Sequence, residues 1–418
     1  MCRFMVFVSG QRPVLLADLI VYPAHSIIKQ SSRSLQRSEG NLNGDGFGVG
    51  WYTRHLLQPT APSSKPTPLM PTSPLSPSKP STAVPHSPTE PSAVAPAAAA
   101  PSPSSSTVAF VDAPEPLCPF GASQNPCVFN SVTPAWNNQN LYRISSKISS
   151  SLVFAHVRAA TEGSLITETN CHPFQWGNYL WMHNGMVAGF PRVKRRILNA
   201  LDSHLFDLIQ GSTDSEHLGL LFLQILLSDN RPGTEIAPYA FLRPYSPSEL
   251  HQALVSTIRT VVRWTREAGV ATFSLLNCAV TDGRSVVVSR FVNDPRIDGA
   301  TLYYNSGSHW HRDPDAPSSY RMLQRDRRQP SHIIASEPLT SFESADFRDW
   351  ISVPRNSVIV IDQASNRLIF PIKDDDDDDE EEEEEDGDFI HIKSTGVSSS
   401  AASLFPKDPP VDISSLIM

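Results

Sequence analysis

Hydrophobic positions in this chain alternate with the period of β-strands near its start and toward its end, and follow helix-start signals in between. Phe4, Val6 and Val8 alternate with neighbours that would face the other side of a strand. Asp282-Gly283 is a hairpin signal between two later strand candidates. The remaining stretches of strand length are residues 47–52, 152–158, 179–185, 271–281, 285–291, 301–305, 332–336, 357–361 and 367–370.

Two helices are predicted in the middle of the chain. Residues 213–216 (Thr-Asp-Ser-Glu) form a capping-box pattern ahead of an apolar helix that ends near Leu227. Residues 246–249 (Ser-Pro-Ser-Glu) repeat it with proline at the first helical position, which predicts a helix to about Ala268. Residues 192–210 are also helical in character.

A glycine-rich segment, residues 41–52, admits two interpretations. A phosphate-binding loop would follow a strand and open a helix, or end in Gly-Lys-Ser/Thr. This segment instead leads from Asn43-Gly44 into the strand candidate 47–52. We therefore expect a turn followed by a strand whose glycines allow another backbone to approach closely.

Two stretches have compositions that predict disorder. Residues 58–107 are rich in Pro, Ser, Ala and Thr and cannot bury enough apolar surface to offset the entropy lost on ordering. They could be a linker or an insertion, and the short segment before them favours an insertion. Residues 371–418 contain an acidic run and a Ser-rich end, which predict a solvated tail. Residues 110–147 give no clear pattern apart from a possible anchor at Trp136.

Charge and cysteine content narrow the classes of function. The chain has 418 residues and a formal charge of −9, but the thirteen consecutive acidic residues at 374–386 account for more than all of it, and the remainder carries +4. A near-neutral folded part implies neither nucleic acid nor an anionic membrane as a partner. The five cysteines show no metal-ligand spacing, and no targeting or membrane-spanning segment is evident. A soluble, cytoplasmic protein without metal or cofactor is expected.

Cys2 is the candidate nucleophile. If Met1 is trimmed, Cys2 carries both a thiol and a free α-amine, whose reference pKa values are about 8.5 and about 7.7–8.0, so the amine can take the thiol proton near neutral pH. A cysteine at position 2 can also occur by chance. The strand predicted directly after Cys2 favours the catalytic interpretation, since a catalytic terminus must be held still.

The motifs taken together resemble class II glutamine amidotransferases, which are N-terminal nucleophile hydrolases. The resemblance spans residues 2–370 without the insertion. It depends on six motifs in this order: Cys2, residues 43–48 (Asn-Gly-Asp-Gly-Phe-Gly), 156–161 (His-Val-Arg-Ala-Ala-Thr), 170–174 (Asn-Cys-His-Pro-Phe), 183–185 (His-Asn-Gly) and 213–216. The residues at 2–4, 45–52, 170–174 and 335–339 are similar to those of a stand-alone subgroup, which includes the fungal amidotransferase-like subunit of a glutathione-degrading complex. Arg3 departs from the family pattern, in which glycine usually follows the nucleophile.

The resemblance implies a fold and a set of site residues. The fold is α+β, a four-layer αββα sandwich with two stacked antiparallel sheets. Cys2 would attack the γ-carbonyl of a glutamine-like group and form a thioester, with its α-amine as base and later as acid. The other roles implied are an oxyanion hole from the Asn184 side chain and the Gly185 N–H, binding of the substrate α-carboxylate by Arg158 with help from Thr161, binding of its α-ammonium by Asp214, and a supporting role behind the site for His172. Glu337 is a further candidate for support of the terminus.

Structural interpretations of the same residues stay open at the level of sequence. Asn184-Gly185 is also a turn signal, Asp214 lies in a helix cap, Arg158 could form a structural ion pair, and His156 and His172 could be buried core histidines.

Three functions are therefore compared. The first is hydrolysis of a γ-glutamyl amide, glutamine or glutathione, with a separate metallopeptidase-like subunit and Cys-Gly as the leaving group. The second is a glutaminase that delivers ammonia to a separate synthase, because nothing after Phe370 could fold as a synthase domain. The third is a catalytically silent interaction subunit that retains Met1.

Overall fold

The computed structural model describes residues 1–10, 12–33, 42–53, 125–160, 164–228, 235–236, 245–324, 330–341 and 343–373. The chain divides into two units, Met1–Gln58 with Leu117–Met418 and, between them, Pro59–Pro116. The second unit lies outside the described residues, as do the predicted insertion at 58–107 and the acidic run. Only the first unit is treated below.

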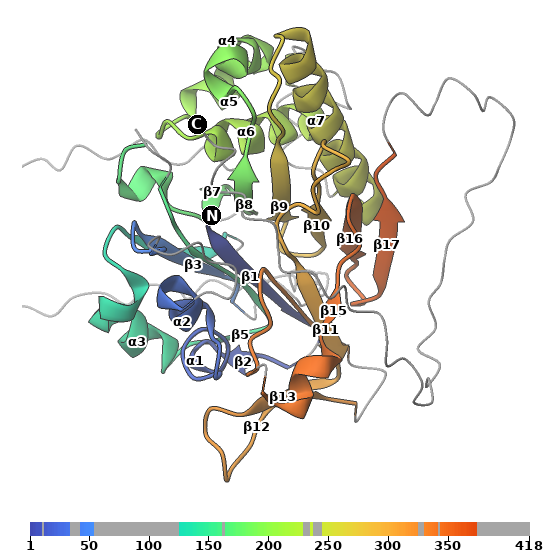
Figure 1. Ribbon diagram of the computed structural model, residues 1–418. Helices are drawn as coiled ribbons and strands as arrows, with labels where there is room; N and C mark the ends of the chain where they lie inside the picture. Colours follow the sequence, from blue (N-terminus) through green and yellow to red (C-terminus); the bar gives the residue numbers. More distant parts are fainter. Residues whose placement is uncertain are drawn as a thin grey trace, which may run out of the picture. The chain divides into compact units, whose positions relative to one another are not determined.

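Two antiparallel sheets form the centre of this unit (Figure 1). The seven-stranded sheet has the order β15 (Ile351–Ser352), β11 (Tyr303–Gly307), β14 (Ser331–Ala335), β1 (Arg3–Ser9), β6 (Leu152–Val157), β3 (Phe47–Trp51) and β4 (Cys127–Ser131). The six-stranded sheet has the order β17 (Arg367–Pro371), β16 (Ser357–Ile361), β10 (Val286–Arg290), β9 (Leu275–Thr281), β8 (Tyr179–Met186) and β7 (Phe174–Trp176). Two short ribbons pair β2 (Val14–Leu15) with β5 (Ser149–Ser150) and β12 (His309–Arg312) with β13 (Tyr320–Leu323).

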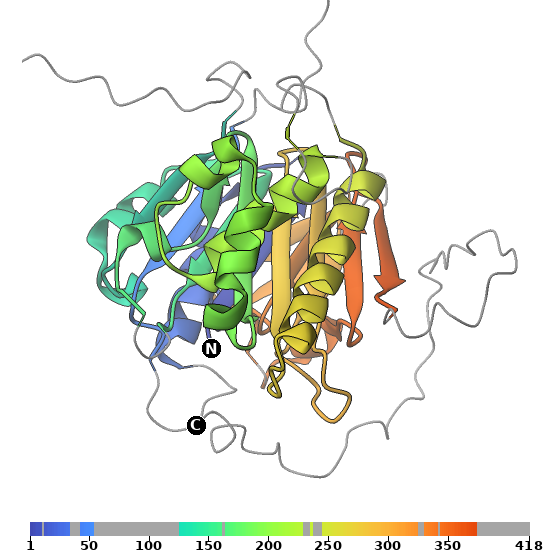
Figure 2. The ribbon, with the colours of Figure 1, turned by 90° about the horizontal axis from the view of Figure 1, so that it is seen from above.

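Helices cover the outer faces of both sheets (Figures 1 and 2). On the seven-stranded sheet they are α1 (Ala17–Ile20), α2 (Ile27–Ser32) and α3 (Gln139–Ser145). On the six-stranded sheet they are α4 (Phe190–Ala200), α5 (Ser203–Asp207), α6 (Asp214–Leu227) and α7 (Pro247–Glu267). Single 3-10 turns occur at η3 (Ala135–Asn137), η4 (Glu168–Asn170) and η6 (Ala345–Asp349). The expected αββα sandwich is confirmed.

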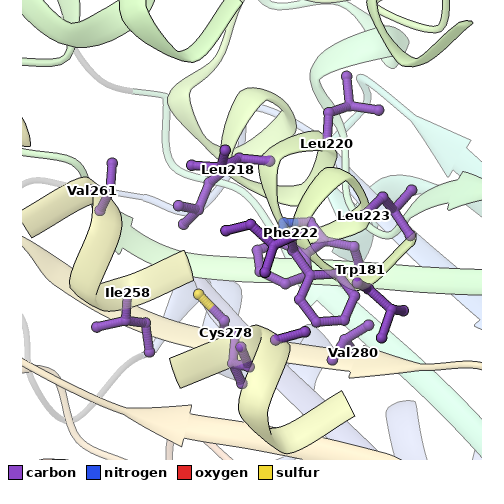
Figure 3. Packing of buried hydrophobic residues seen from close by; sticks show 14 of the residues in the cluster. Trp181, Leu218, Leu220, Phe222, Leu223, Ile258, Val261, Cys278 and Val280 are labelled. Atoms are coloured by element: carbon purple, nitrogen blue, oxygen red, sulfur yellow. The ribbon is translucent and has the colours of Figure 1, made fainter. Parts of the chain in front are cut away.

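Three separate hydrophobic cores lie between the layers, one between the two sheets and one between each sheet and the helices that cover it. Side chains of β1 alternate between two of them: Phe4 and Val6 pack between the sheets, whereas Met5 and Phe7 pack toward α1 and α2. All seven residues of β1 are buried because the strand lies between β14 and β6 with a core on each face. The third core joins the six-stranded sheet to α6 and α7, where Trp181 packs among leucines of α6 (Figure 3).

Capping explains why α6 and α7 begin where the sequence predicts. The Ser246 hydroxyl accepts the Glu249 N–H and the Glu249 carboxylate accepts the Ser246 N–H, a complete capping box. At α6 the Thr213 hydroxyl accepts the Glu216 N–H, but the Glu216 carboxylate accepts the N–H groups of residues 210 and 211 instead. The predicted capping box at α6 is therefore only half formed, although the helix is where it was expected.

The strand predicted over 179–185 is confirmed, but the turn interpretation of Asn184-Gly185 is wrong. Both residues lie inside β8, paired with Asn277 and Leu276 of β9. The ladder to β9 supplies hydrogen bonds along the strand, so cross-strand pairing overrides the local preference. The prediction for residues 47–52 is confirmed: a Cβ on Gly48 would lie 2.1 Å from the His172 carbonyl oxygen.

Candidate active site

Cys2 lies at the entrance to β1, in the middle of the seven-stranded sheet. Pairing of Arg3 with Val157 brings the terminus beside the end of β6. The Cys2 thiol is half-buried there; its Sγ lies 3.5 Å from the Ala159 carbonyl oxygen and accepts the Ala159 N–H at 3.4 Å. The terminus is therefore held against the segment that follows β6.

Arg158, the residue before Ala159, is a buried cation with donors to spare. Its side chain donates from Nη2 to the Ser164 hydroxyl at 2.6 Å and to the Leu165 carbonyl at 3.0 Å. Its Nη1 is buried without a hydrogen-bond partner, and Arg158 is 3% exposed. Among the described residues no carboxylate forms an ion pair with it, so the alternative interpretation as a structural ion pair is not supported. A buried guanidinium with an unused nitrogen is suited to a bidentate anionic group.

Asn184 connects β8 to the start of β1 across the space between the sheets. Its Nδ2 lies 3.3 Å from the Ser336 hydroxyl, and this hydroxyl also accepts the Phe4 N–H at 3.0 Å. The Asn184 Oδ1 is buried and has no partner. If the amide turned by 180°, its oxygen would accept the Ser336 O–H and its NH₂ would occupy the position that now lacks a partner.

Gly185 and Asp214 lie at the end of the same strand. A Cβ on Gly185 would lie 1.8 Å from the Leu275 carbonyl oxygen, so only glycine allows β8 and β9 to pair here. Asp214 opens α6, and its Oδ2 accepts the Val187 N–H at 2.8 Å. Asp214 is thus hydrogen-bonded to Val187, which follows β8 and lies two residues after Gly185.

These contacts bring the sequence-predicted residues to one end of the two sheets. Cys2 contacts the residue after Arg158, Ser336 connects Phe4 to Asn184, and Asp214 is hydrogen-bonded just beyond Gly185. In Figure 1 the N-terminus is drawn at the entrance to β1, and β1 contacts β8. Thr161 lies outside the described residues.

His172 lies behind these groups, in contact with a second histidine. The His156 and His172 rings stack with centroids 4.1 Å apart, and no ring nitrogen of either is in hydrogen-bonding geometry with a partner. Burial lowers the pKa of His156 to about 3 and that of His172 well below its ordinary value. Both rings are therefore neutral at neutral pH, which suits packing rather than proton transfer. The neighbouring Cys171 is a buried thiol, and burial raises its pKa to about 11.

The sequence pattern gave little warning of a buried charge cluster at the terminus. Arg3 Nε donates to Glu337 Oε1 at 2.8 Å, and Glu337 Oε2 lies 2.7 Å from His25 Nε2. Arg3 Nη1 donates to the carbonyl oxygens of Met1 at 3.1 Å and Cys2 at 2.8 Å. Two members had been singled out in the sequence, the unexpected arginine after the nucleophile and Glu337 as a candidate for support of the terminus, whereas His25 had not.

Within the described ranges, no three His, Cys, Asp or Glu side chains come together as metal ligands would. None of the helices that the structure describes is both long and apolar enough to cross a bilayer. The four cysteines among these residues, Cys2, Cys127, Cys171 and Cys278, are free thiols.

Two antiparallel sheets between helical layers, with a cysteine at the start of a central strand, define an N-terminal-nucleophile type of fold. Residues 128–384 match the family described as class-II glutamine amidotransferases. The chain is 35% identical over 381 residues to the probable glutamine amidotransferase DUG3 of Saccharomyces cerevisiae, covering 90% of this chain and 85% of that protein. The chain therefore belongs to the class II glutamine amidotransferases.

Solved structures of the same class are more distant. A glutamine aminotransferase class-II domain protein from Silicibacter pomeroyi is 18% identical, with a TM-score of 0.47 and coverage of 89% of this chain and 100% of that one. A predicted glutamine amidotransferase from Pseudomonas aeruginosa is 15% identical, with a TM-score of 0.39 and coverage of 87% and 94%.

Proposed function

We propose that this protein is an amidohydrolase that uses Cys2 as an N-terminal nucleophile on γ-glutamyl amides. After removal of Met1, the Cys2 α-amine takes the thiol proton, and Sγ attacks the γ-carbonyl carbon. The C–N bond breaks as the amine returns a proton to the leaving nitrogen, and water then hydrolyses the thioester to release glutamate. The position of Cys2 at the entrance to β1, rather than on a free end, supports this chemistry.

The substrate's polar groups have complementary partners in the proposal. Arg158 binds the α-carboxylate through Nη1, with Thr161 assisting. Asp214 binds the α-ammonium through carboxylate lone pairs that the Val187 N–H and the Ser215 hydroxyl do not use. The Asn184 amide and the Gly185 N–H stabilise the tetrahedral oxyanion. The buried, unpartnered Nη1 of Arg158 beside the Cys2 contact is the observation that carries this assignment.

Glutathione is the proposed physiological substrate, with Cys-Gly as the leaving group and a metallopeptidase-like subunit as the partner in the cytoplasm. This proposal is supported by the residues at 2–4, 45–52, 170–174 and 335–339, which are similar to those of the glutathione-degrading subgroup. Membership in the glutamine amidotransferases favours a second candidate, a glutaminase that supplies ammonia to a partner synthase.

One experiment separates these candidates. The recombinant protein, with and without its co-purifying partner, is assayed on glutamine and glutathione in parallel, and intact mass reports whether Met1 is removed. Faster release of glutamate from glutathione supports the first candidate, and faster glutamine hydrolysis supports the second. Retained Met1 with no hydrolysis of either substrate would identify a silent interaction subunit.

Cys2→Ala is expected to lower hydrolysis by more than about 10³-fold with the fold intact, because no other group supplies the nucleophile. Cys127→Ala, which removes an exposed free thiol on β4, is the control and should leave turnover unchanged. Undiminished turnover in Cys2→Ala would refute the nucleophile assignment.

A further inference from the structure

Arg3 is the feature of the sequence that the proposed function leaves unexplained. The position after the nucleophile usually holds glycine in the family that the motifs resemble, whereas this chain has a long cationic side chain there. Arg3 is nevertheless 3% exposed, on the first position of a central strand. Burial of a guanidinium is costly unless it is paired and hydrogen-bonded, so the fold must provide partners.

The partners of Arg3 come from elements remote in sequence. Glu337, 334 residues away, follows β14 and accepts the Arg3 Nε–H. Its second oxygen binds His25, which precedes α2, and Gln30 Nε2 donates to the backbone oxygens of both His25 and Glu337. Glu337 is 1% exposed, so the carboxylate cannot move away without breaking several buried hydrogen bonds.

Arg3, Glu337 and His25 together are called the clamp below. A second nitrogen of the Arg3 guanidinium, Nη1, contacts the N-terminal backbone. Arg3 Nη1 donates to the Cys2 carbonyl at 2.8 Å and to the Met1 carbonyl at 3.1 Å. Trimming of Met1 removes the second acceptor and leaves the bond to Cys2. The Arg3 side chain then contributes, together with the Ala159 contact, to the orientation of the Cys2 backbone and so to the direction of Sγ and the α-amine.

We propose that Arg3, locked by Glu337 and His25, is a positioning residue that orients the N-terminal nucleophile. This inference rests on the proposed function of Cys2. Arg3 touches the nucleophilic residue and not the substrate, so its loss should lower kcat and leave KM nearly unchanged. A misplacement of about 1 Å typically costs about 10²-fold in rate.

The test compares Arg3→Met, Arg3→Lys and Glu337→Gln with wild type, with kcat expressed per trimmed chain as measured by intact mass. Arg3→Met is expected to lower kcat by about 10²-fold with KM within threefold. Arg3→Lys keeps the charge but loses the fork, and Glu337→Gln keeps an acceptor but loses the charge, so both should retain intermediate kcat. The control is Arg367→Met: this arginine of β17, a strand separated from β8 by three others, donates to Ser306 and stacks on Tyr304, and its loss should leave kcat unchanged.

A pH profile distinguishes positioning from a structural role. Charged or titratable groups around the terminus are Arg3, Glu337 and His25 of the clamp, Arg158 after β6, Asp45, whose carboxylate accepts the Ala160 N–H, and the buried thiol of Cys171, which interacts with Cys2. A cation beside an amine favours its neutral form, so the acid limb of kcat/KM should move to higher pH in Arg3→Met and stay in place in Arg3→Lys. A purely structural role would move neither limb.

The two hypotheses fail differently. If wild type hydrolyses neither substrate, or Cys2→Ala retains full activity, the proposed function fails. If wild type is active and depends on Cys2, while Arg3→Met matches Arg367→Met in kcat and in the acid limb, the positioning role alone is overturned.

Discussion

Single residues at this site are notable for hydrogen-bonding capacity that they do not use. Arg158 Nη1 and Asn184 Oδ1 are both buried without partners, although buried polar groups in folded proteins are nearly always paired. Arg158 precedes Ala159, which contacts the Cys2 thiol, and Asn184 is hydrogen-bonded to Ser336, whose hydroxyl accepts the N–H of Phe4. Unsatisfied groups gathered in one place are what a site built for a polar ligand requires, because the ligand supplies the missing partners.

At this scale, Arg158→Met is expected to raise KM for glutamine by about 10–100-fold, since a hydrogen bond to a charged group contributes about 1.5–3 kcal/mol. Initial rates against substrate concentration measure the effect. The matched comparison uses 4-aminobutanamide, which is glutamine without its α-carboxylate. Wild type and variant should handle this compound equally, and a loss of the same size on both substrates would contradict carboxylate binding by Arg158.

At the scale of elements, β8 both carries site residues and contacts the opposite sheet. It pairs with β9 over seven residues and places Asn184 next to Ser336, the residue after β14. The close β8–β9 approach at Gly185 keeps this strand regular through the site. The geometry of the proposed oxyanion hole therefore depends on strand pairing.

Gly185→Ala tests this dependence. Its Cβ would meet the Leu275 backbone, with the carbonyl oxygen at 1.8 Å, so β8 and β9 must separate and the free energy of unfolding should fall by about 3 kcal/mol. Urea unfolding measures the change, and kcat should fall with it. Gly269→Ala is the control: with φ +67° and no atom within 4 Å of its Cβ, it should cost about 1–2 kcal/mol and leave kcat unchanged.

On the scale of the whole molecule, the αββα layers bury histidines as well as apolar side chains. His156, His172 and His332 are each 5% exposed or less, and burial lowers the pKa of all three, to about 3 for His156 and about 4 for His332. The unfolded chain binds protons at these rings below about pH 6.5, whereas the folded chain does not. Their contribution to stability is therefore complete above pH 6.5 and is lost as pH falls toward the folded pKa values.

The free energy of unfolding should consequently fall as pH is lowered from 7.5 to 5.5. Each of these histidines contributes about 1.4 kcal/mol per pH unit once the unfolded ring is protonated. Urea titrations at three pH values measure the slope. His332→Gln, which can still donate to the Ser365 carbonyl, should reduce the slope by one histidine's share, and a flat profile in wild type would contradict the argument.

The segment between β3 and β4 should be dispensable for activity. Trp51, at the end of β3, pairs directly with Cys127, at the start of β4, so the two strands form a hairpin whose ends a short link can join. We propose that residues 2–370 form the amidotransferase domain, that residues 58–107 are an insertion in it, and that residues 371–418 are a tail. Deletion of 58–107 should leave kcat and KM within about twofold, because loop length affects stability only weakly. A large loss of turnover would show that the segment contributes to the site.

The sequence alone was sufficient to predict those helices and strands whose signal lies within a few neighbouring residues. Capping residues located α6 and α7, and runs of apolar residues located β1, β6, β9, β10, β11, β14, β16 and β17, whereas the short strands β12, β13 and β15 were not predicted. Weakly marked elements were missed: α1 and α2 have four and six residues and no side-chain cap, and η3, α3 and β4 lie in the stretch left unassigned. Trp136, the one anchor expected there, packs against the core of the seven-stranded sheet.

The motif order by itself determined the class of fold and which residues to consider, since nucleophile, glycine-rich strand and helix cap are each encoded within a few residues. Only the tertiary structure decided how they meet. Pairing with β9 carries β8 through the turn signal Asn184-Gly185, and Arg3 is hydrogen-bonded to Glu337, 334 residues away in the chain. Such contacts cannot be predicted from neighbouring residues in the sequence. A buried charge or a buried amide is paired with whichever distant element the packing of the fold places beside it.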